Sequence, residues 1–376
     1  MKVSVIGAGS WGSAIAWLLG EKGIDVCLWA RDDALVDSFN ATRQNPRYLK
    51  DIVFSSTVTA STNLIEVLAA TEAVALVTPS AVVEDMAKRI APHLEEQVPV
   101  VLLSKGIEGT TGTLLLDVLA ENFIATKQQK QHEQQEQQGQ HEQQHPVKPF
   151  DPSAQIGASE HFGWPEHFGP HERLAVLSGP NHAEEVAHGI PSGTVVASLS
   201  QETAKFFQEL FGTPEFRVYT SHDTVGVQLC GATKNIIAIA CGMAAGLGLG
   251  DNTAAMLMTR GLAEISRLVK QLGGDPRTCM GLAGMGDLIA TCTSQHSRNR
   301  AFGIEFAQGG TLDAYLKRTH MVVEGALAAK SITDLAKTFS VDLPISTAIR
   351  NVVWDQCPIT EGLASLIDRS FKPEFY

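Results

Sequence analysis

The sequence has 376 residues, of which 44% are hydrophobic, and its formal net charge is −12. This length exceeds one ordinary domain, and the acidic balance without any Lys/Arg block argues against nucleic acid and against an anionic membrane surface as partners. The six cysteines are scattered and show no metal-ligand spacing, so we expect no metal site and a reduced, cytoplasmic protein.

The first twenty residues predict a dinucleotide-binding turn. An apolar strand over residues 2–6 leads into Gly7-Ala8-Gly9-Ser10-Trp11-Gly12, and a helix follows over 13–19. In this motif the first glycine permits a tight turn, the second lets the backbone approach a pyrophosphate, and the third lets the helix pack on the strand. A glycine-rich turn without a ligand is the alternative. Because the strand begins at residue 2, we expect no leader peptide before it.

A second strand over residues 24–29 ends near Arg31, which bears on the choice of cofactor. An arginine here favours the 2′-phosphate of NADP, whereas an acidic residue favours the ribose hydroxyl of NAD. Arg31 comes first and Asp32-Asp33 follow at once, so the sequence leans towards NADP or dual use without deciding. An exposed arginine with no ligand is the alternative.

Three further predicted strands end in polar or glycine-rich segments. The strands span residues 73–77, 99–103 and 174–177, with helices predicted over 82–90 and 113–123. The segments that follow them are Thr78-Pro79-Ser80, Ser104-Lys105-Gly106 and Ser178-Gly179-Pro180-Asn181, the last preceding a helix that opens at His182. Ligands of open parallel sheets bind beyond the carboxyl ends of the strands. These segments, the glycine turn and Arg31 are therefore expected along one ligand-binding edge.

An insertion at about 126–171 interrupts the sheet domain. Residues 128–144 are mostly Gln with His, Glu and Lys and have no apolar period. Such a segment buries too little surface to offset its ordering entropy, so we expect it to be solvated and disordered. It joins a helix to the next strand, which predicts that it leaves from the amino ends of the strands, away from the ligand edge.

The chain then changes character. Residues 191–198, 203–210 and 216–219 read as strand, helix and strand and complete the sheet domain, whereas long helices are predicted over 224–243 and from about 251 to 272. The predicted fold class is α/β, with a Rossmann-like dinucleotide-binding domain over 1–220 followed by an all-α domain over 221–376. The longest uncharged stretch, 235–250, is too short and glycine-rich to span a membrane.

Three segments of the helical half carry candidate chemistry. Lys234-Asn235 lie in an apolar helix, where the lysine is either a snorkelling side chain or a buried amine with a tuned pKa. The stretch 281–288 presents Asp287 after several glycines, or is a plain loop with a capping Asp. Ser297-Arg298-Asn299-Arg300 offers donors that could hold a phosphate, or is a solvated loop.

Together these motifs resemble a known family. They are Ile6–Gly12, Ser104–Gly106, Ser178–Pro180, Val227–Leu229 with Lys234-Asn235, Gly284–Leu288, Ser297–Arg300 and Val322–Gly325. In this order they resemble the bacterial NAD(P)-dependent sn-glycerol-3-phosphate dehydrogenases, over nearly the whole chain except the insertion. The resemblance implies a helical domain like that of 6-phosphogluconate dehydrogenase, and a cytosolic enzyme, usually a homodimer, that interconverts dihydroxyacetone phosphate and sn-glycerol 3-phosphate for phospholipid synthesis.

The resemblance also implies residue roles. Lys234 would be the general acid/base. Besides the glycines at 7, 9 and 12, the side chains lining NAD or NADP would be Ser10, Trp11, Arg31, Lys105, Ala183, Arg298, Val322 and Glu324. The phosphorylated substrate would contact Lys105, Gly179, Asn181, Lys234, Asp287, Ser297, Arg298 and Asn299. Asn181 departs from the family, which often carries Ser or Thr there.

The expected chemistry is consistent with these residues. When hydride reaches the ketone carbon, the oxygen gains negative charge, and the ammonium of Lys234 can donate a proton to it. Burial and Lys105 would lower the pKa of Lys234, whereas Asp287 would raise it. Two alternatives remain: a ketopantoate- or hydroxyisobutyrate-type dehydrogenase of the same two-domain plan, and a non-catalytic dinucleotide sensor.

Overall fold

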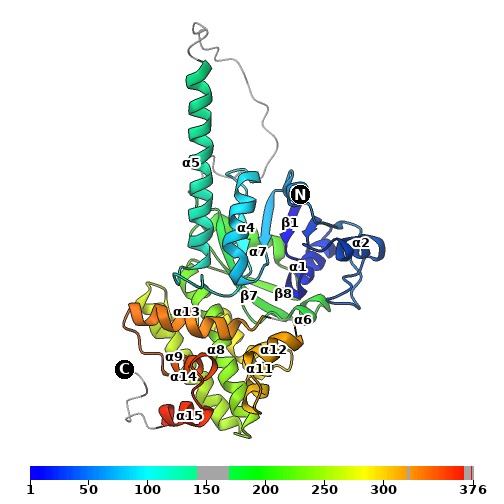
Figure 1. The fold of residues 1–376 in the computed structure, drawn as a ribbon. Helices are drawn as coiled ribbons and strands as arrows, with labels where there is room; N and C mark the ends of the chain where they lie inside the picture. Colours follow the sequence, from blue (N-terminus) through cyan, green and yellow to red (C-terminus); the bar gives the residue numbers. More distant parts are fainter. Residues whose placement is uncertain (142–168, 320–321, 368–373, 375–376) are drawn as a thin grey trace.

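The computed structural model describes residues 1–141, 169–319, 322–367 and 374. A mixed sheet flanked by helices forms the first part of the chain, and a group of helices packs below its lower edge (Figure 1). This arrangement confirms the predicted fold class, a Rossmann-like sheet domain followed by an all-helical one.

In the described residues the strands form one eight-stranded sheet in the order β3-β2-β1-β4-β5-β6-β7-β8. The first six run parallel in the doubly wound order, β7 is antiparallel to β6, and β8 is parallel to β7. The central strands are buried on both faces, which is why they read as continuous apolar runs. The strands are β1 (Lys2–Ile6), β2 (Asp25–Trp29), β3 (Val58–Ser61), β4 (Ala73–Leu76), β5 (Val100–Leu102), β6 (Leu174–Ser178), β7 (Ser192–Ala197) and β8 (Phe216–Ser221).

Helices cover both faces of the sheet. One core lies between the sheet and α1, α2, α6 and α7, and a second lies between the opposite face and α3, α4 and α5. These helices are α1 (Ser10–Glu21), α2 (Asp33–Thr42), α3 (Leu64–Leu68), α4 (Val83–Ile90), α5 (Leu115–His141), α6 (Ala183–Ala187) and α7 (Gln201–Phe211). The helix α2, the strand β3 and the helix α3 went unpredicted; the edge strand β3 has four residues and a weak apolar signal.

The helix α5 corrects one expectation about the insertion. It continues to His141, so residues 128–141 are helical rather than disordered. Gln, Glu and Lys are good helix formers, and the helix grows from an apolar first half that packs on the sheet. Figure 1 shows its far end projecting away from the helical domain, on the side of the amino ends of the strands, as expected. Residues 142–168 lie outside the described part of the chain.

The helical domain is built around α8 (Thr224–Gly246), which is buried from Gly226 to Ala244. A Cβ at Gly242 would overlap the carbonyl of Arg300, and one at Gly303 would overlap that of Ile239, so α8 and α11 pack backbone against backbone. The other helices are α9 (Asp251–Gln271), α10 (Asp287–Thr293), α11 (Arg298–Ala307), α12 (Leu312–Thr319), α13 (Glu324–Thr338), α14 (Pro344–Trp354) and α15 (Ile359–Ile367).

The helix α8 is long and apolar enough to cross a membrane, but 89% of its most apolar window is buried inside the protein. It is therefore the core helix of the second domain. Gly261 on α9 and Gly325 on α13 let these two helices approach α8 closely, since a Cβ there would meet Ile237 and the carbonyl of Asn235.

Candidate active site

The glycine turn between β1 and α1 has the shape of a dinucleotide cradle. Gly7 has φ +123°, and a Cβ there would lie 2.6 Å from the carbonyl oxygen of Val77. A Cβ at Gly12 would overlap the carbonyl of Gly7, whereas one at Gly9 would meet open space. Gly9 also caps α1 without a side-chain acceptor. The turn thus offers open backbone at the positive end of a twelve-residue helix, which fits a pyrophosphate.

The parallel sheet brings the predicted segments to one edge. The glycine turn, Arg31, Thr78–Ser80, Lys105-Gly106 and Gly179 follow β1, β2, β4, β5 and β6, whose carboxyl ends all point the same way. Arg31 and Lys105 lie at the ends of strands three positions apart, a span of about 14 Å at the usual strand spacing. The edge therefore suits an elongated ligand, with Arg31 towards one end and Lys105 towards the other.

The acidic residues after Arg31 are engaged within the protein. Asp32 caps α2 by accepting a hydrogen bond from the backbone N–H of Leu35 at 3.1 Å, and its other oxygen pairs with Arg47. Asp33 accepts a hydrogen bond from the Thr62 hydroxyl at 2.7 Å. Arg31 itself is exposed beside them.

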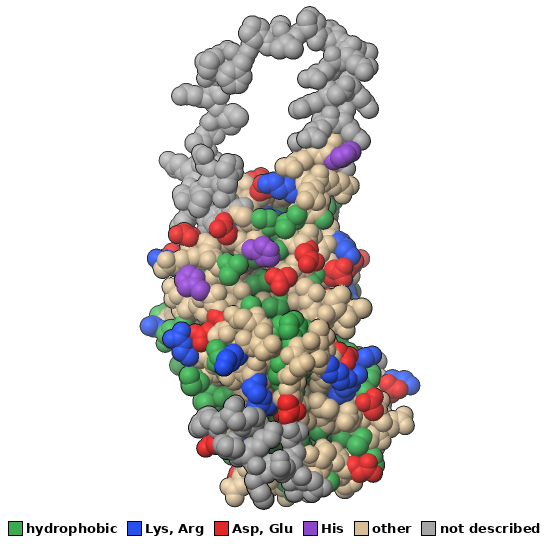
Figure 2. Space-filling view, turned by 90° about the vertical axis from the view of Figure 1, so that its left-hand side faces the viewer, with side chains coloured by type: hydrophobic (Ala, Val, Ile, Leu, Met, Phe, Trp, Pro, Cys, Tyr) green, Lys and Arg blue, Asp and Glu red, His purple; other side chains and the backbone are tan. Residues whose placement is uncertain are grey.

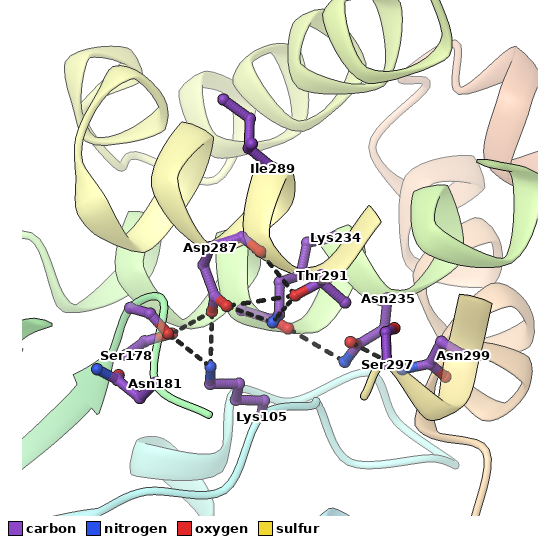
Figure 3. A network of polar contacts seen from close by, with 12 residues as sticks. Lys105, Ser178, Asn181, Lys234, Asn235, Asp287, Ile289, Thr291, Ser297 and Asn299 are labelled. Atoms are coloured by element: carbon purple, nitrogen blue, oxygen red, sulfur yellow. Dashed lines mark hydrogen bonds and ion pairs between the residues drawn. The ribbon is translucent and has the colours of Figure 1, made fainter. Parts of the chain in front are cut away.

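A buried network joins the sheet edge to the helical domain (Figure 3). Asp287 pairs through Oδ1 with Nζ of Lys234, and through Oδ2 with Nζ of Lys105 at 2.6 Å. The hydroxyl of Thr291 accepts a hydrogen bond from Lys234 at 2.6 Å, and the carbonyl of Gly179 accepts one from Lys105 at 3.0 Å. One carboxylate therefore holds two ammonium groups, one from each domain.

Lys234 is the deeper of the two lysines, with 5% of its surface exposed. Its pKa is lowered from 10.5 to about 8, because burial and the charge of Lys105, which lower it, together outweigh the carboxylate of Asp287, which raises it. Burial would raise the pKa of Asp287, but Lys105 and Lys234 together outweigh it and hold that pKa below 3.8. Because this ammonium is buried against Asp287 and Thr291 in the middle of α8, the interpretation of Lys234 as a snorkelling side chain is wrong.

The orientation of Asp287 comes from an unusual local backbone. A π-helical turn, Leu282–Gly286, runs directly into α10, and a Cβ at Gly284 would overlap the backbone of Cys279. Asp287 and Thr291 lie four residues apart on the buried face of α10, whereas Ile289 points away from the network (Figure 3). The interpretation of this stretch as a plain loop with a capping Asp is therefore wrong.

A second set of contacts orders the start of α11. The Nδ2 of Asn299 donates to Oδ1 of Asn235 at 3.0 Å, and Oδ1 of Asn299 accepts from the N–H of Gly325 at 2.9 Å. Ser297 is the N-cap of α11 and accepts from Arg300 N–H at 3.3 Å. Arg298 is exposed in the first helical turn. The segment 297–300 is thus a helix start with an exposed guanidinium, not a solvated loop.

The remaining predicted residues lie outside the lysine network, on the sheet edge and on the helices beside it. Ser80 donates a hydrogen bond to Glu324 at 2.7 Å, which links the sheet edge to α13. The Oδ1 of Asn181 accepts from the Thr194 hydroxyl at 3.0 Å, so this amide faces β7. Ala183 is buried at the start of α6, against the core around α1. Val322 is exposed just before α13, and Trp11 packs on Phe216.

Acidic and basic side chains are interspersed on the face shown in Figure 2. Since the chain carries a net charge of −12, an anionic ligand must be held by a few placed cations. Lys105 and Lys234 supply two such cations, both paired with Asp287, and the exposed Arg298 at the start of α11 supplies a third.

Sequence reasoning missed two members of the site. Thr291 was not singled out, although its spacing of four from Asp287 would have placed both on one helix face had α10 been predicted. Asn45 was also missed: it is fully buried, and its amide donates to the carbonyl of Ala8 at 3.1 Å and to the hydroxyl of Ser13 at 2.8 Å. It thereby holds the loop after α2 against the glycine turn.

Comparisons with known proteins match both halves of the chain. A family described as the NAD-dependent glycerol-3-phosphate dehydrogenase N-terminus matches residues 2–130 and 164–204, and the corresponding C-terminus matches 223–364. The glycerol-3-phosphate dehydrogenase (NAD(P)+) of Shouchella clausii is 39% identical over 368 residues, covering 98% of this chain and 96% of that protein.

Solved structures agree. A glycerol-3-phosphate dehydrogenase from Coxiella burnetii is 30% identical, with a TM-score of 0.82, and the match covers 98% of this chain and 99% of that one. A ketopantoate reductase from Ralstonia eutropha, the type of enzyme considered as an alternative, is 14% identical with a TM-score of 0.51 over 94% of this chain and 97% of that one, a likeness of fold alone. This chain belongs to the NAD-dependent glycerol-3-phosphate dehydrogenase family.

Proposed function

We propose that this chain is an NAD(P)-dependent glycerol-3-phosphate dehydrogenase in which Lys234 is the proton donor and acceptor. The activity follows from the family and from its relatives' names. The observation that carries the catalytic assignment is the buried Lys234 ammonium, held by Asp287 and Thr291 at the edge of the dinucleotide-binding sheet. The reaction interconverts dihydroxyacetone phosphate and glycerol 3-phosphate, which supplies phospholipid synthesis.

The lysine network supports a proton transfer. Bound NAD(P)H supplies the hydride to the substrate ketone carbon. Lys234 donates a proton to the ketone oxygen and, in the reverse direction, accepts it from the alcohol; a pKa of about 8 suits both tasks. Lys105 stabilises the developing negative charge, and Asp287 keeps the two ammonium groups in place despite their mutual repulsion. Thr291 fixes the direction of the Lys234 side chain.

The phosphate of the substrate belongs at the start of α11. There the guanidinium of Arg298 and the helix N-terminus capped by Ser297 offer donors and positive potential, and Asn299 anchors the turn to Asn235. Gly179 and Asn181 complete the substrate side from the end of β6. Because Asn181 already bonds Thr194, its contact with substrate is the weakest of this set.

NAD(P) would be held along the sheet edge, where Gly7–Gly12 would receive its pyrophosphate and Lys105 and Glu324 would flank its nicotinamide end. Ser10, Trp11, Ala183 and Val322 line the same stretch. The carboxylate of Asp32 is already bonded to Leu35 and Arg47, so it is less available to bind a ribose 2′-hydroxyl. This leaves Arg31 as the side chain that meets that end of the cofactor, which supports acceptance of a 2′-phosphate. We infer dual use of NADH and NADPH, with NADPH favoured.

We further infer a cytoplasmic homodimer, as in the family. All six cysteines are free thiols, and five of them are buried, which suits a reducing compartment. Leu247, Leu249 and Met256 are exposed around the α8–α9 connection and offer an apolar surface for a second copy. Light scattering at micromolar concentration tests this state, and a monomer mass would reject it.

The catalytic assignment is tested with Lys234→Ala. We expect the Kd for NADPH to stay within about twofold of the parent, while kcat for reduction of dihydroxyacetone phosphate falls by about 10³-fold. Lys88→Ala is the matched control, since Lys88 is an exposed lysine paired with Glu84 on α4. Turnover in Lys234→Ala equal to that of Lys88→Ala would reject the role. Unphosphorylated dihydroxyacetone should be a very poor substrate for every variant.

A further inference from the structure

The segment that follows β4 contacts the helical domain through Ser80, a residue with no role in the proposed mechanism. Ser80 begins a short 3-10 turn, Ser80–Val82, at the ligand edge of the sheet. Its hydroxyl donates to Oε2 of Glu324, the first residue of α13, at 2.7 Å across 244 residues of sequence. This hydrogen bond joins the two domains beside the proposed cofactor site.

The surroundings of this contact are built to hold it. A Cβ at Gly106 would lie 2.5 Å from Cβ and 2.8 Å from Oγ of Ser80, and 3.9 Å from Oε2 of Glu324. No side chain fits at Gly106, so the loop that carries Lys105 closes directly over the Ser80–Glu324 pair. The Ser80–Glu324 hydrogen bond therefore lies directly against the loop that carries Lys105.

Glu324 is a carboxylate under opposing influences. The pKa of Glu324 is raised above its ordinary value because burial outweighs three opposing influences: hydrogen bonds from the Ser80 hydroxyl and backbone N–H, and the charge of Arg298 on α11. Arg298 is thus the charged side chain acting on Glu324, and Ser80 supplies its hydrogen-bond donors. Without the hydroxyl, the carboxylate would lose both an orienting contact and part of what keeps it ionised.

We propose that Ser80 is a positioning residue that clasps Glu324 across the domain boundary and holds its carboxylate in place for the nicotinamide cofactor. This rests on the proposed function, which assigns Glu324 to the cofactor. Ser80 itself touches neither reacting atom. It acts by fixing the rotamer and charge of Glu324, with Gly106 leaving the room that the clasp requires.

The experiment is a double-mutant cycle on cofactor binding. Isothermal titration calorimetry gives the Kd for NADPH of the parent, Ser80→Ala, Glu324→Gln and the double variant between pH 5 and 9. We expect Ser80→Ala to weaken binding by about tenfold, the size of one hydrogen bond to a charged group. We expect the double variant to bind no more weakly than Glu324→Gln alone, because both changes break one interaction.

The pH dependence separates positioning from general destabilisation. Binding by the parent should weaken as falling pH protonates Glu324, and in Ser80→Ala this weakening should begin at a higher pH. Ser198→Ala is the control, since its buried hydroxyl donates to the carbonyl of Leu174 at 2.7 Å, remote from the ligand edge. It should lose stability without changing the Kd.

The outcomes distinguish the two proposals. If Glu324→Gln binds NADPH as the parent does, the assignment of Glu324 to the cofactor fails. If Glu324→Gln is weakened but Ser80→Ala keeps the parent affinity and pH profile, or if the two effects are simply additive, the clasp is overturned and the cofactor assignment stands.

Discussion

Replacing Asp287 by Asn removes one negative charge from between two ammonium groups while keeping the shape of the side chain. The amide retains one carbonyl oxygen, so it can accept from Lys234 or Lys105 but not from both with equal strength. Because Asp287 is 2% exposed and Lys234 5%, little water can take over the lost role of the carboxylate.

The magnitude follows from burial and charge. Breaking a buried ion pair by removing one partner costs about 3–5 kcal/mol of stability. Because Asn keeps one carbonyl oxygen, we expect the unfolding free energy of this variant to fall by about 3 kcal/mol. The carboxylate raises the pKa of Lys234 against burial and Lys105, so in Asp287→Asn that pKa falls below about 8. A misplaced and less protonated lysine should lower kcat/KM for reduction by about 10²-fold at pH 7.

The assay is the initial rate of dihydroxyacetone phosphate reduction with saturating NADPH from pH 6 to 10. Since the ammonium is the acid, the parent rate should fall as pH rises through about 8, and the Asp287→Asn rate should fall at a lower pH. Chemical denaturation measures the stability change on the same samples. An unchanged pH profile in this variant would refute the reasoning, whatever happened to the absolute rate.

Three further predictions concern other parts of the chain. Arg298→Ala should raise the KM for dihydroxyacetone phosphate at least tenfold with a smaller change in kcat, whereas Arg89→Ala on α4 should change neither. Burial raises the pKa of Glu264 to about 7, so its contribution to stability is fully present below pH 4.5 and is lost as the pH rises through 7. Chemical denaturation between pH 4 and 8 should show the unfolding free energy falling by about 3 kcal/mol from this group, and by less in Glu264→Gln. Deleting residues 128–144 should leave kcat and KM within about twofold, because α5 leaves the domain away from the ligand edge; a large rise in KM would contradict that placement.

The fold was largely predictable where one signal dominates. The buried strands β1, β4, β5 and β6 are continuous apolar runs, and parallel topology then forces Gly9, Lys105 and Gly179 to the same edge. The prediction for residues 128–141 was wrong because it relied on apolar periodicity, which this part of α5 lacks. A helix that is already anchored at one end can continue through polar residues if they are good helix formers.

The sequence predicted which residues are candidates for the site, but not which of them contact one another. Lys234 and Asp287 are 53 residues apart in the sequence. Asp287 directly follows the π-helical turn before α10, and no residue pattern in the sequence predicts such a turn. For the same reason Thr291 could not be assigned before its helix was known. The contact of Ser80 with Glu324 spans two domains, so only their packing reveals it.

The central claim is that Lys234 carries the transferred proton, and titration of its own side chain tests this most directly. NMR of the protein with 13C-labelled lysine, assigned by comparison with Lys234→Arg, reports the pKa of Lys234 while rates are measured on the same samples. We expect a pKa of about 8 that coincides with the pH at which reduction slows. A lysine that titrates near 10.5, or a rate profile that breaks at a pH unrelated to it, would contradict the account.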